Sequence, residues 1–313
     1  MPAKLYLLMS VTMLFLFALL FGLLALIGYF FNISDYVIVF SAIALVLFQW
    51  YMAPRLIELT MNMRYLNKNE YPEIWKNVKE ICKKTKTPIP RIAILRSGSP
   101  NAFVFGRTPK SATLVLSSGL LKILNKNELK AVIAHEIGHI NHKDMIVMTL
   151  VGSIPVIAYH VYRFLMYSED ERRKGGALMV ALTAFLVYLV SNLLVLLLSR
   201  LREYHADRFG AINTKPRWLI NALVKITYGL SVSEERINEN LRSFYIADPI
   251  TSKKEIGMLW GFYSDLRFTE REVKEAMEWE KRNPSTRILE IFHTHPLTFK
   301  RIEALMKLEK EKK

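Results

Sequence analysis

His135, Glu136 and His139 form a His-Glu-x-x-His motif in which the two histidines stand four residues apart. Residues at this spacing lie on one face of an α-helix, so both imidazoles can approach a single metal ion. Glu136 then lies beside the ion, where it can take a proton from a metal-bound water molecule. The motif therefore indicates a metal-dependent hydrolase. The alternative is two ordinary histidines on a helix with no ion between them.

The residues around the motif predict the helix that it needs, over 127–144. Apolar residues recur there at helical spacing, namely Leu129, Val132, Ile133, Ile137 and Ile140. Asn125 or Asn127 can cap the helix start, and Glu128 lies in the first turn, where the helix dipole favours an acid. Gly138 costs about 1 kcal/mol in a helix interior relative to alanine. We interpret it as a place where another backbone approaches the helix closely.

Two histidines leave a catalytic zinc site incomplete, because such a site usually has three protein ligands. His142 lies about 10 Å from His135 along a straight helix, so we exclude it as a ligand and expect a solvated residue at the helix C-terminus. Further along, Glu203 and Asp207 share a helical face. Glu203 can complete the site while Asp207 reaches the free ring nitrogen of a ligating histidine. Composition alone is equally compatible with an exposed helix face at these residues.

Four apolar runs interrupt the chain, which is 51% hydrophobic and 23% charged. Each is long enough to cross a bilayer, and they cover residues 5–31, 36–53, 145–166 and 177–198. We expect two transmembrane hairpins, the first closed by a tight turn at 32–35. A cleaved signal peptide is the alternative for the first run, but its apolar region would be shorter. His160, inside the third run, is interpreted as a buried, hydrogen-bonded side chain rather than a transport ligand.

The segments 54–144 and 199–313 have the composition of a soluble domain. Short strands are expected at 91–96, 101–106 and 111–117, which would form a small sheet ahead of the motif helix. Further helices are expected at 71–86, 200–212, 218–228, 234–245, 269–281 and 296–308. Leu56, Leu59, Met63 and Leu66 are spaced like one face of a helix that continues from the second span. Cys82 is the single cysteine, which excludes an intramolecular disulfide.

The net charge of +15 favours an anionic membrane surface, rather than nucleic acid, as a partner, because the basic residues fall mostly between and after the apolar runs. Two spans return the chain to the side it left, so ligands on both sides of the second hairpin share one compartment. Basic residues near the spans favour the cytoplasm for the soluble segments; they include Arg55, Lys143, Arg200 and Arg202. The loop with Arg172, Arg173 and Lys174 argues against that orientation.

Four motifs, in the same order, resemble the M48 metallopeptidases, over a stretch from the first span to about Leu305. They are Asn101-Ala102-Phe103 with Gly106, the His135-Glu136-x-x-His139 helix, Glu203-x-x-x-Asp207, and Thr294-His295-Pro296 with Arg301. The resemblance implies one zinc ion per chain, bound by His135, His139 and Glu203, with Glu136 as general base. It also implies that Asp207 and Arg301 support the ligands.

The same resemblance gives roles to two further sites. Asn101, Ala102 and Phe103 would lie on an edge strand that pairs with an extended substrate, which gives main-chain recognition. His295 would stabilise the tetrahedral oxyanion. His293 stands two residues away, and the alternative for His295 is an ordinary helix-entry residue before Pro296.

We therefore predict a mostly α integral membrane protein with four transmembrane helices in two hairpins and an α+β, zincin-like metalloprotease domain with a small sheet. The expected function is zinc metalloendopeptidase in the cell membrane, with the protease domain in the cytoplasm. Its expected substrates are polypeptides, chiefly misfolded membrane proteins in quality control. A CAAX-prenyl-protein endopeptidase of the same family is the alternative enzyme, although that branch has more spans. A metal transporter or a non-catalytic zinc-binding scaffold is the alternative of another class, although His160 alone offers a ligand within the spans.

Overall fold

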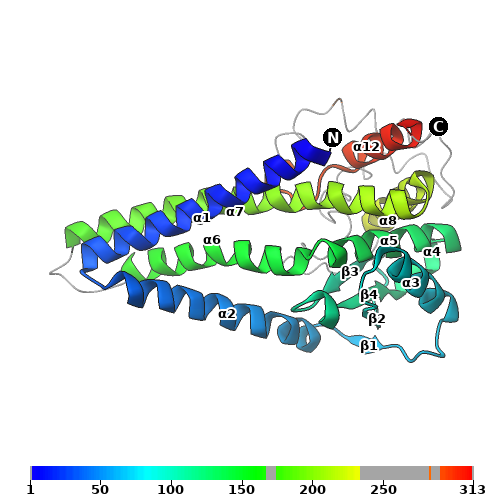
Figure 1. Cartoon of the computed structure of the whole chain (residues 1–313), viewed down its shortest axis with the longest axis horizontal. Coiled ribbons are helices and arrows are strands. Elements are labelled where there is room, and N and C mark those ends of the chain that lie inside the picture. The colour runs from blue at the N-terminus through cyan, green and yellow to red at the C-terminus, as the bar shows by residue number, and fades with distance from the viewer. Residues whose placement is uncertain (1, 167–173, 233–281, 283–289, 312–313) are drawn as a thin grey trace. The chain divides into compact units, whose positions relative to one another are not determined.

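The structure, a computed structural model, describes residues 2–166, 174–232, 282 and 290–311 (Figure 1). The chain forms two compact units that alternate along the sequence. One consists of Met1–Leu56 and Ile146–Leu201, and the other of Ile57–Met145 and Arg202–Lys313. The predicted helices at 234–245 and 269–281 lie outside the described residues.

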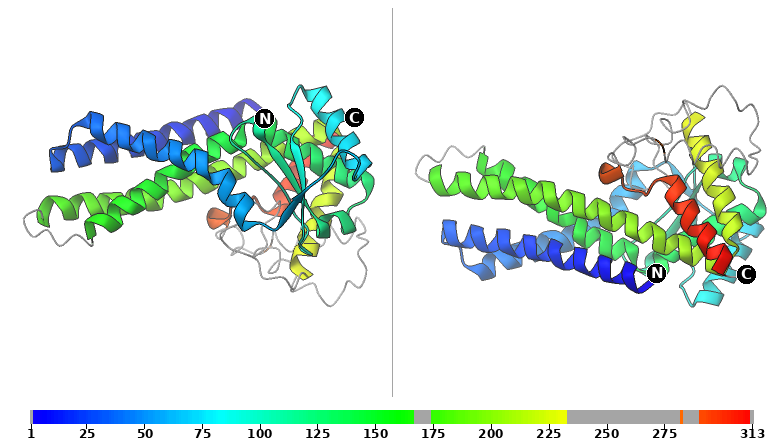
Figure 2. Two further views of the ribbon diagram at one scale, coloured as in Figure 1. Left: turned by 90° about the horizontal axis from the view of Figure 1, so that it is seen from below. Right: turned by 90° about the horizontal axis from the view of Figure 1, so that it is seen from above.

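The first unit is built from four helices that are long and apolar enough to cross a membrane. They belong to α1 (Pro2–Phe31), α2 (Asp35–Thr60), α6 (Asp144–Met166) and α7 (Lys174–Asn213). These helices pack side by side through a core that includes Leu16, Val151, Ile154 and Leu198 (Figures 1 and 2). Large apolar side chains remain on the outside, among them Leu14, Phe40 and Phe164, each more than 70% exposed. A bilayer supplies the apolar surroundings that such faces require.

Helix α7 continues without a break for 40 residues. At a rise of 1.5 Å per residue it is about 60 Å long, roughly twice the thickness of a hydrocarbon core. The apolar run predicted at 177–198 and the helix predicted at 200–212 are thus parts of one element. The C-terminal part of α7 carries Glu203 and Asp207 into the second unit.

The second unit contains a small mixed sheet with the strand order β1-β2-β4-β3. The strands are β1 (Met63–Tyr65), β2 (Arg91–Leu95), β3 (Ala102–Phe105) and β4 (Thr113–Ser117). β2 and β4 are parallel, and the two outer strands pair antiparallel to them. The predicted small sheet is confirmed, but the helical face drawn through Met63 and Leu66 is wrong. Met63 pairs with Leu95 in the ladder, and Leu66 is buried in the core beside the sheet.

Residues alternate between the two faces of this sheet, as side chains on a strand do. One face, with Ile92, Leu114 and Leu116, packs against α3 (Pro72–Thr85) and α5 (Lys126–Asn141). The other face, with Phe103 and Val115, packs against the last turn of α2. The sheet is therefore covered on both sides.

Helix α5 carries the His-Glu-x-x-His motif and begins with a capping box. The side chain of Asn125 accepts hydrogen bonds from the backbone N–H groups of Asn127 and Glu128, and the Glu128 carboxylate accepts one from the Asn125 N–H. The helix is buried almost continuously from Ala131 to Gly138. Its second side packs against α8 (Pro216–Val232), and α8 packs on α12 (Thr298–Glu311); Ala131 of α5 belongs to the core cluster that these two helices form. The remaining short helices are α4 (Ser118–Ile123), η1 (Pro109–Ser111) and η4 (Glu290–Phe292).

Candidate metal centre

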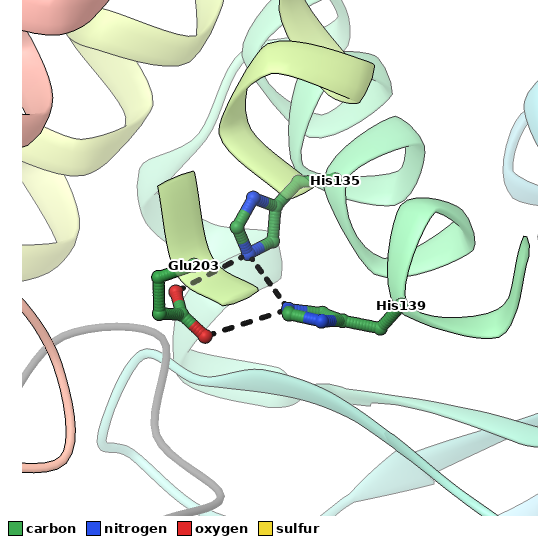
Figure 3. Close-up of side chains that lie close together, drawn as sticks. All are labelled: His135, His139 and Glu203. Atoms are coloured by element: carbon green, nitrogen blue, oxygen red, sulfur yellow. Dashed lines mark hydrogen bonds and ion pairs between the residues drawn. The ribbon is translucent and has the colours of Figure 1, made fainter. Parts of the chain in front are cut away.

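His135, His139 and Glu203 form the one group in the described chain with three side chains that could hold a metal ion (Figure 3). The two Nε2 atoms lie 3.2 Å apart. The Glu203 carboxylate lies 3.6 Å from His135 Nε2 through one oxygen and 3.5 Å from His139 Nε2 through the other. Helix α5 supplies both imidazoles, and α7 supplies the carboxylate (Figure 3). The structure thus brings together the three residues that the sequence predicts as ligands.

Asp207 and Arg301 lie behind this group. Asp207 Oδ1 is 3.0 Å from His135 Nδ1. Arg301 donates two hydrogen bonds to the Asp207 carboxylate, from Nε at 2.8 Å and from Nη2 at 2.7 Å. The same guanidinium lies 3.1 Å from Glu203. Since Arg301 comes from α12, this helix fixes two acids of α7 at once.

Asp144 and Arg202 also belong to the cluster, and the sequence reasoning does not find them there. Asp144 Oδ2 lies 2.6 Å from His139 Nδ1. Its other oxygen forms an ion pair with the Arg202 guanidinium. In the sequence, Asp144 only marks the boundary of an apolar run, and Arg202 counts as a basic residue near a span. Their positions in the sequence could have indicated a role at the site. Asp144 comes shortly after the end of α5, and Arg202 is the residue before Glu203.

Glu136 is buried in the same region and is 2% exposed. Burial raises the pKa of its carboxyl above the usual value, and the nearby His135 and His139 oppose this rise. A carboxyl with a raised pKa is a better proton acceptor than an ordinary glutamate. The position suits a group that must take up a proton and release it again.

His295 lies on the other side of Glu203. Its Nδ1 is 3.5 Å from Glu203 Oε2, and the residue is 4% exposed. Its buried Nε2 has no hydrogen-bond partner among the residues that the structure describes. The ring is therefore held beside the ligand group with one nitrogen available to a further molecule.

His142 is not the solvated residue expected from its position at the end of α5. Its ring stacks on His205 with centroids 3.5 Å apart and an interplanar angle of 8°. Burial, followed by the charge of neighbouring His205, lowers the pKa of His142 to about 3. The imidazole is thus neutral and takes part in packing instead of providing a positive charge.

Two glycines lie where α5 and α7 meet. A Cβ atom on Gly138 would lie 3.1–3.2 Å from the side chain of Phe209, so the expected backbone neighbour at Gly138 is wrong. The close approach of two backbones occurs at Gly210 instead, where a Cβ atom would lie 3.1 Å from the backbone nitrogen of His135. The absence of a side chain at Gly210 therefore sets how near α7 comes to the first histidine.

Strand β3 is the last strand in the sheet order, and it packs against α5. Asn101, directly before it, is 4% exposed and exchanges hydrogen bonds with Ser117 of β4. Ala102 pairs with Leu116 and faces the core under α5, whereas the Phe103 side chain lies in the core on the other side of the sheet. The structure thus places the predicted substrate-binding residues on an edge strand next to the helix with the histidines.

The charges of the cluster are not balanced within the described chain. Four carboxylates are 2–6% exposed, and the two guanidinium groups among them are 1–3% exposed; they belong to Glu136, Asp144, Glu203, Asp207, Arg202 and Arg301. The four acids outnumber the two guanidinium groups; burial raises the pKa of the Glu136 carboxyl, and, against the effect of burial, Glu203 raises the pKa of the His139 ring. Buried charges require partners, so a divalent cation fits the charge as well as the three converging atoms.

Two histidines of a His-Glu-x-x-His helix and a glutamate from a second helix, in a chain with four helices able to cross a membrane, define the class of membrane-bound, metal-dependent hydrolases. The model of Peptidase family M48 matches residues 68–309. The chain belongs to this family, as its motifs predict.

Individual relatives agree with this membership. The chain is 35% identical over 230 residues to "Protease HtpX homolog" from Methanothermobacter thermautotrophicus, an alignment that covers 73% of this chain and 88% of that protein. It is 33% identical over 307 residues to "Protease HtpX homolog" from Pyrococcus furiosus, which covers 95% and 94% respectively. The fold is similar to the crystal structure of S. mikatae Ste24p, with a TM-score of 0.53 and 18% identity over 97% of this chain and 67% of that one. The protein is a multi-pass, membrane-bound metalloprotease that acts on polypeptides.

Proposed function

We propose that the chain is a zinc endopeptidase with one zinc ion bound by His135, His139 and Glu203. The observation that carries the proposal is the meeting of these three buried side chains, whose ligand atoms lie within 4.8 Å of one another. Tetrahedral zinc with ligand distances of about 2.0–2.2 Å has neighbouring ligand atoms about 3.3–3.6 Å apart. The separation of 3.2 Å between the two Nε2 atoms is close to this spacing, and each Nε2 has a different Glu203 oxygen at 3.5–3.6 Å, so a small rotation of the carboxylate would bring one oxygen to both. Two imidazoles and one carboxylate are also a usual donor set for catalytic zinc.

Bound zinc would polarise the scissile carbonyl and lower the pKa of a water molecule beside it. Glu136 follows His135 directly on α5, and its raised pKa suits a base that accepts the proton of the attacking water. The same carboxyl can then pass the proton to the leaving amine. His295 lies next to Glu203 with Nε2 available, so it can donate a hydrogen bond to the oxyanion of the tetrahedral intermediate.

An extended substrate would bind along β3. Pairing with an edge strand uses main-chain hydrogen bonds and gives little side-chain selectivity. Ala102 would contribute its backbone next to α5, whereas the N–H and C=O of Asn101 are already bonded to Ser117 of β4. Phe103 would contribute only backbone, because its side chain belongs to the core formed with the last turn of α2.

We further infer the membrane arrangement from the ligand group. His139 precedes α6 and Glu203 follows the apolar part of α7, yet the two side chains lie 3.5 Å apart. If α6 and α7 cross the membrane, they must form a hairpin that returns the chain to one side. The segments 54–144 and 199–313 would then make one zincin-like domain, on the cytoplasmic side by the basic residues near the spans. Misfolded membrane proteins are the substrates that suit a protease joined to four spans.

The decisive experiment compares wild type with Glu136→Gln after purification in detergent. Zinc per chain is measured by elemental analysis, and cleavage of an unfolded polypeptide is followed on a gel. We expect equal zinc and loss of cleavage in Glu136→Gln. Wild-type protein that retains zinc but cleaves nothing would refute the protease proposal.

Matched variants separate the roles. Glu128 is another buried glutamate of α5, and it pairs with Lys225 at 2.8 Å outside the ligand group. Glu128→Gln should therefore keep both zinc and cleavage. Glu203→Ala should lose zinc, and Asp207→Ala should lose less of it, because Asp207 contacts a ligand and not the ion. Zinc retained in Glu203→Ala would overturn the ligand assignment.

A further inference from the structure

Both histidines of the ligand group have a carboxylate at their second ring nitrogen. Asp207 Oδ1 lies 3.0 Å from Nδ1 of His135, and Asp144 Oδ2 lies 2.6 Å from Nδ1 of His139. The contact at His139 is a hydrogen bond, whereas the contact at His135 is an ion-pair distance only. An ionised carboxylate can only accept hydrogen bonds, so His139 Nδ1 is the donor to Asp144. In that tautomer Nε2 of His139 is the nitrogen with a free lone pair, and it faces His135 at 3.2 Å.

The Asp144 carboxylate is itself held in place. Asp144 is 5% exposed, and its second oxygen is ion-paired with Arg202, which is 3% exposed. The Arg202 guanidinium supplies a counter-charge to the Asp144 carboxylate beside the imidazole. Arg202 stands directly before Glu203 on α7, so the helix that presents the candidate carboxylate ligand also fixes the carboxylate behind His139.

We propose that Asp144 is a positioning residue for the metal site, which holds the His139 ring in the tautomer and orientation that direct Nε2 at the ion. The proposal rests on the proposed function, since it assumes that His139 binds metal. Carboxylates behind ligating histidines fix the ring and raise its basicity, and their loss typically weakens metal binding by about 10–100-fold. Arg202 acts through Asp144 by supplying its counter-charge.

A purely structural role is the competing explanation. Asp144 is the acidic residue in the first turn of α6, where it interacts favourably with the helix dipole. Its loss could then destabilise the chain without touching the metal. Glu128 provides a matched control, because it is also a buried, ion-paired acid in the first turn of a helix, with Lys225 as its partner.

The test measures Zn²⁺ affinity of the full-length protein in detergent by competition with a chromogenic chelator. Thermal unfolding of the metal-free protein is recorded in parallel. We expect Asp144→Ala to bind Zn²⁺ at least tenfold more weakly than wild type, and Glu128→Ala to bind it as tightly as wild type even where its unfolding temperature falls. Asp144→Asn keeps an oxygen that can accept from Nδ1 without the charge, so its affinity should lie between wild type and Asp144→Ala.

Wild-type affinity in Asp144→Ala, or equal losses in Asp144→Ala and Glu128→Ala, would overturn the proposal. Should Asp144→Ala not fold, Asp144→Asn decides, because wild-type affinity there would show that the charge at Nδ1 contributes nothing. These results differ from failure of the proposed function, in which wild type itself would bind no Zn²⁺ or would not cleave.

Discussion

Replacing Gly210 with alanine should weaken metal binding without lowering the stability of the fold. The new Cβ would lie 3.1 Å from the backbone nitrogen of His135 and 3.3 Å from its Cα atom. Ordinary contact begins at 3.4 Å, so α5 and α7 must separate by a few tenths of an ångström. Metal–ligand distances are expected to lie within about 0.2 Å of their usual values. The two helices that carry His135 and Glu203 would thus move apart by more than the site accepts.

Two opposing effects decide how Gly210→Ala changes the free energy of unfolding. Alanine replaces glycine in a helix with a gain of up to about 1 kcal/mol, which offsets the cost of the small separation. The unfolding temperature of the metal-free protein should therefore stay close to wild type. The loss should appear in Zn²⁺ affinity, by about tenfold or more, as for other changes that disturb ligand orientation.

Gly138→Ala is the matched control for Gly210→Ala. Both substitutions add one methyl group at the contact between α5 and α7. At Gly138 the nearest atoms are Cδ1, Cβ and Cγ of Phe209 rather than the backbone of a ligand. Rotation of the ring can relieve part of this contact without moving His135 or Glu203. Chelator competition should show lower affinity in the Gly210 variant and near wild-type affinity in the Gly138 variant. Identical affinities in both variants would refute the reasoning from helix separation.

Two further predictions concern buried groups of the second unit. Burial raises the pKa of the single cysteine, Cys82, to about 11, so thiol reagents should label the native protein only slowly at pH 8. The stabilisation from the neutral thiol is present below the unfolded pKa of about 8.5 and is lost as the pH rises towards 11; rapid native-state labelling at pH 8 would contradict this. Arg301→Met leaves Asp207 and Glu203 without their shared cation and should cost about 3–5 kcal/mol in unfolding free energy, measured by denaturant titration. Arg301→Lys should cost less, and equal losses in the two variants would argue against a charge effect.

The parts of the site that the sequence predicts are those set by local patterns. The helix of His135 and His139 follows from apolar spacing and from the Asn125 capping box, all within one segment. Glu203 and Asp207 share a helical face, so their joint appearance at the site needs only the assumption that α7 reaches it. The helix of the histidines does not depend on how distant segments pack, whereas the place of Glu203 at the site is predicted by the resemblance to the M48 metallopeptidases.

The features that the sequence does not give depend on distant contacts. Met63 fits a helical face by spacing, yet it forms a strand because β2 offers it a pairing partner, Leu95, far along the chain. His142 would be solvated on an isolated helix, but α7 brings His205 against it. The residue that allows close approach is Gly210 rather than Gly138, and only the packing of α5 on α7 distinguishes the two.

The site repeats one arrangement twice. His135 has Asp207 behind it and Arg301 behind Asp207, while His139 has Asp144 behind it and Arg202 behind Asp144. Each aspartate is paired with its arginine; His139 Nδ1 donates to Asp144, and Asp207 Oδ1 lies 3.0 Å from His135 Nδ1. The two Nε2 atoms lie 3.2 Å apart beside the Glu203 carboxylate, so a cation bound between these three groups would interact with all of them. Four helices, α5, α6, α7 and α12, thus contribute side chains to one site whose charge favours a divalent ion.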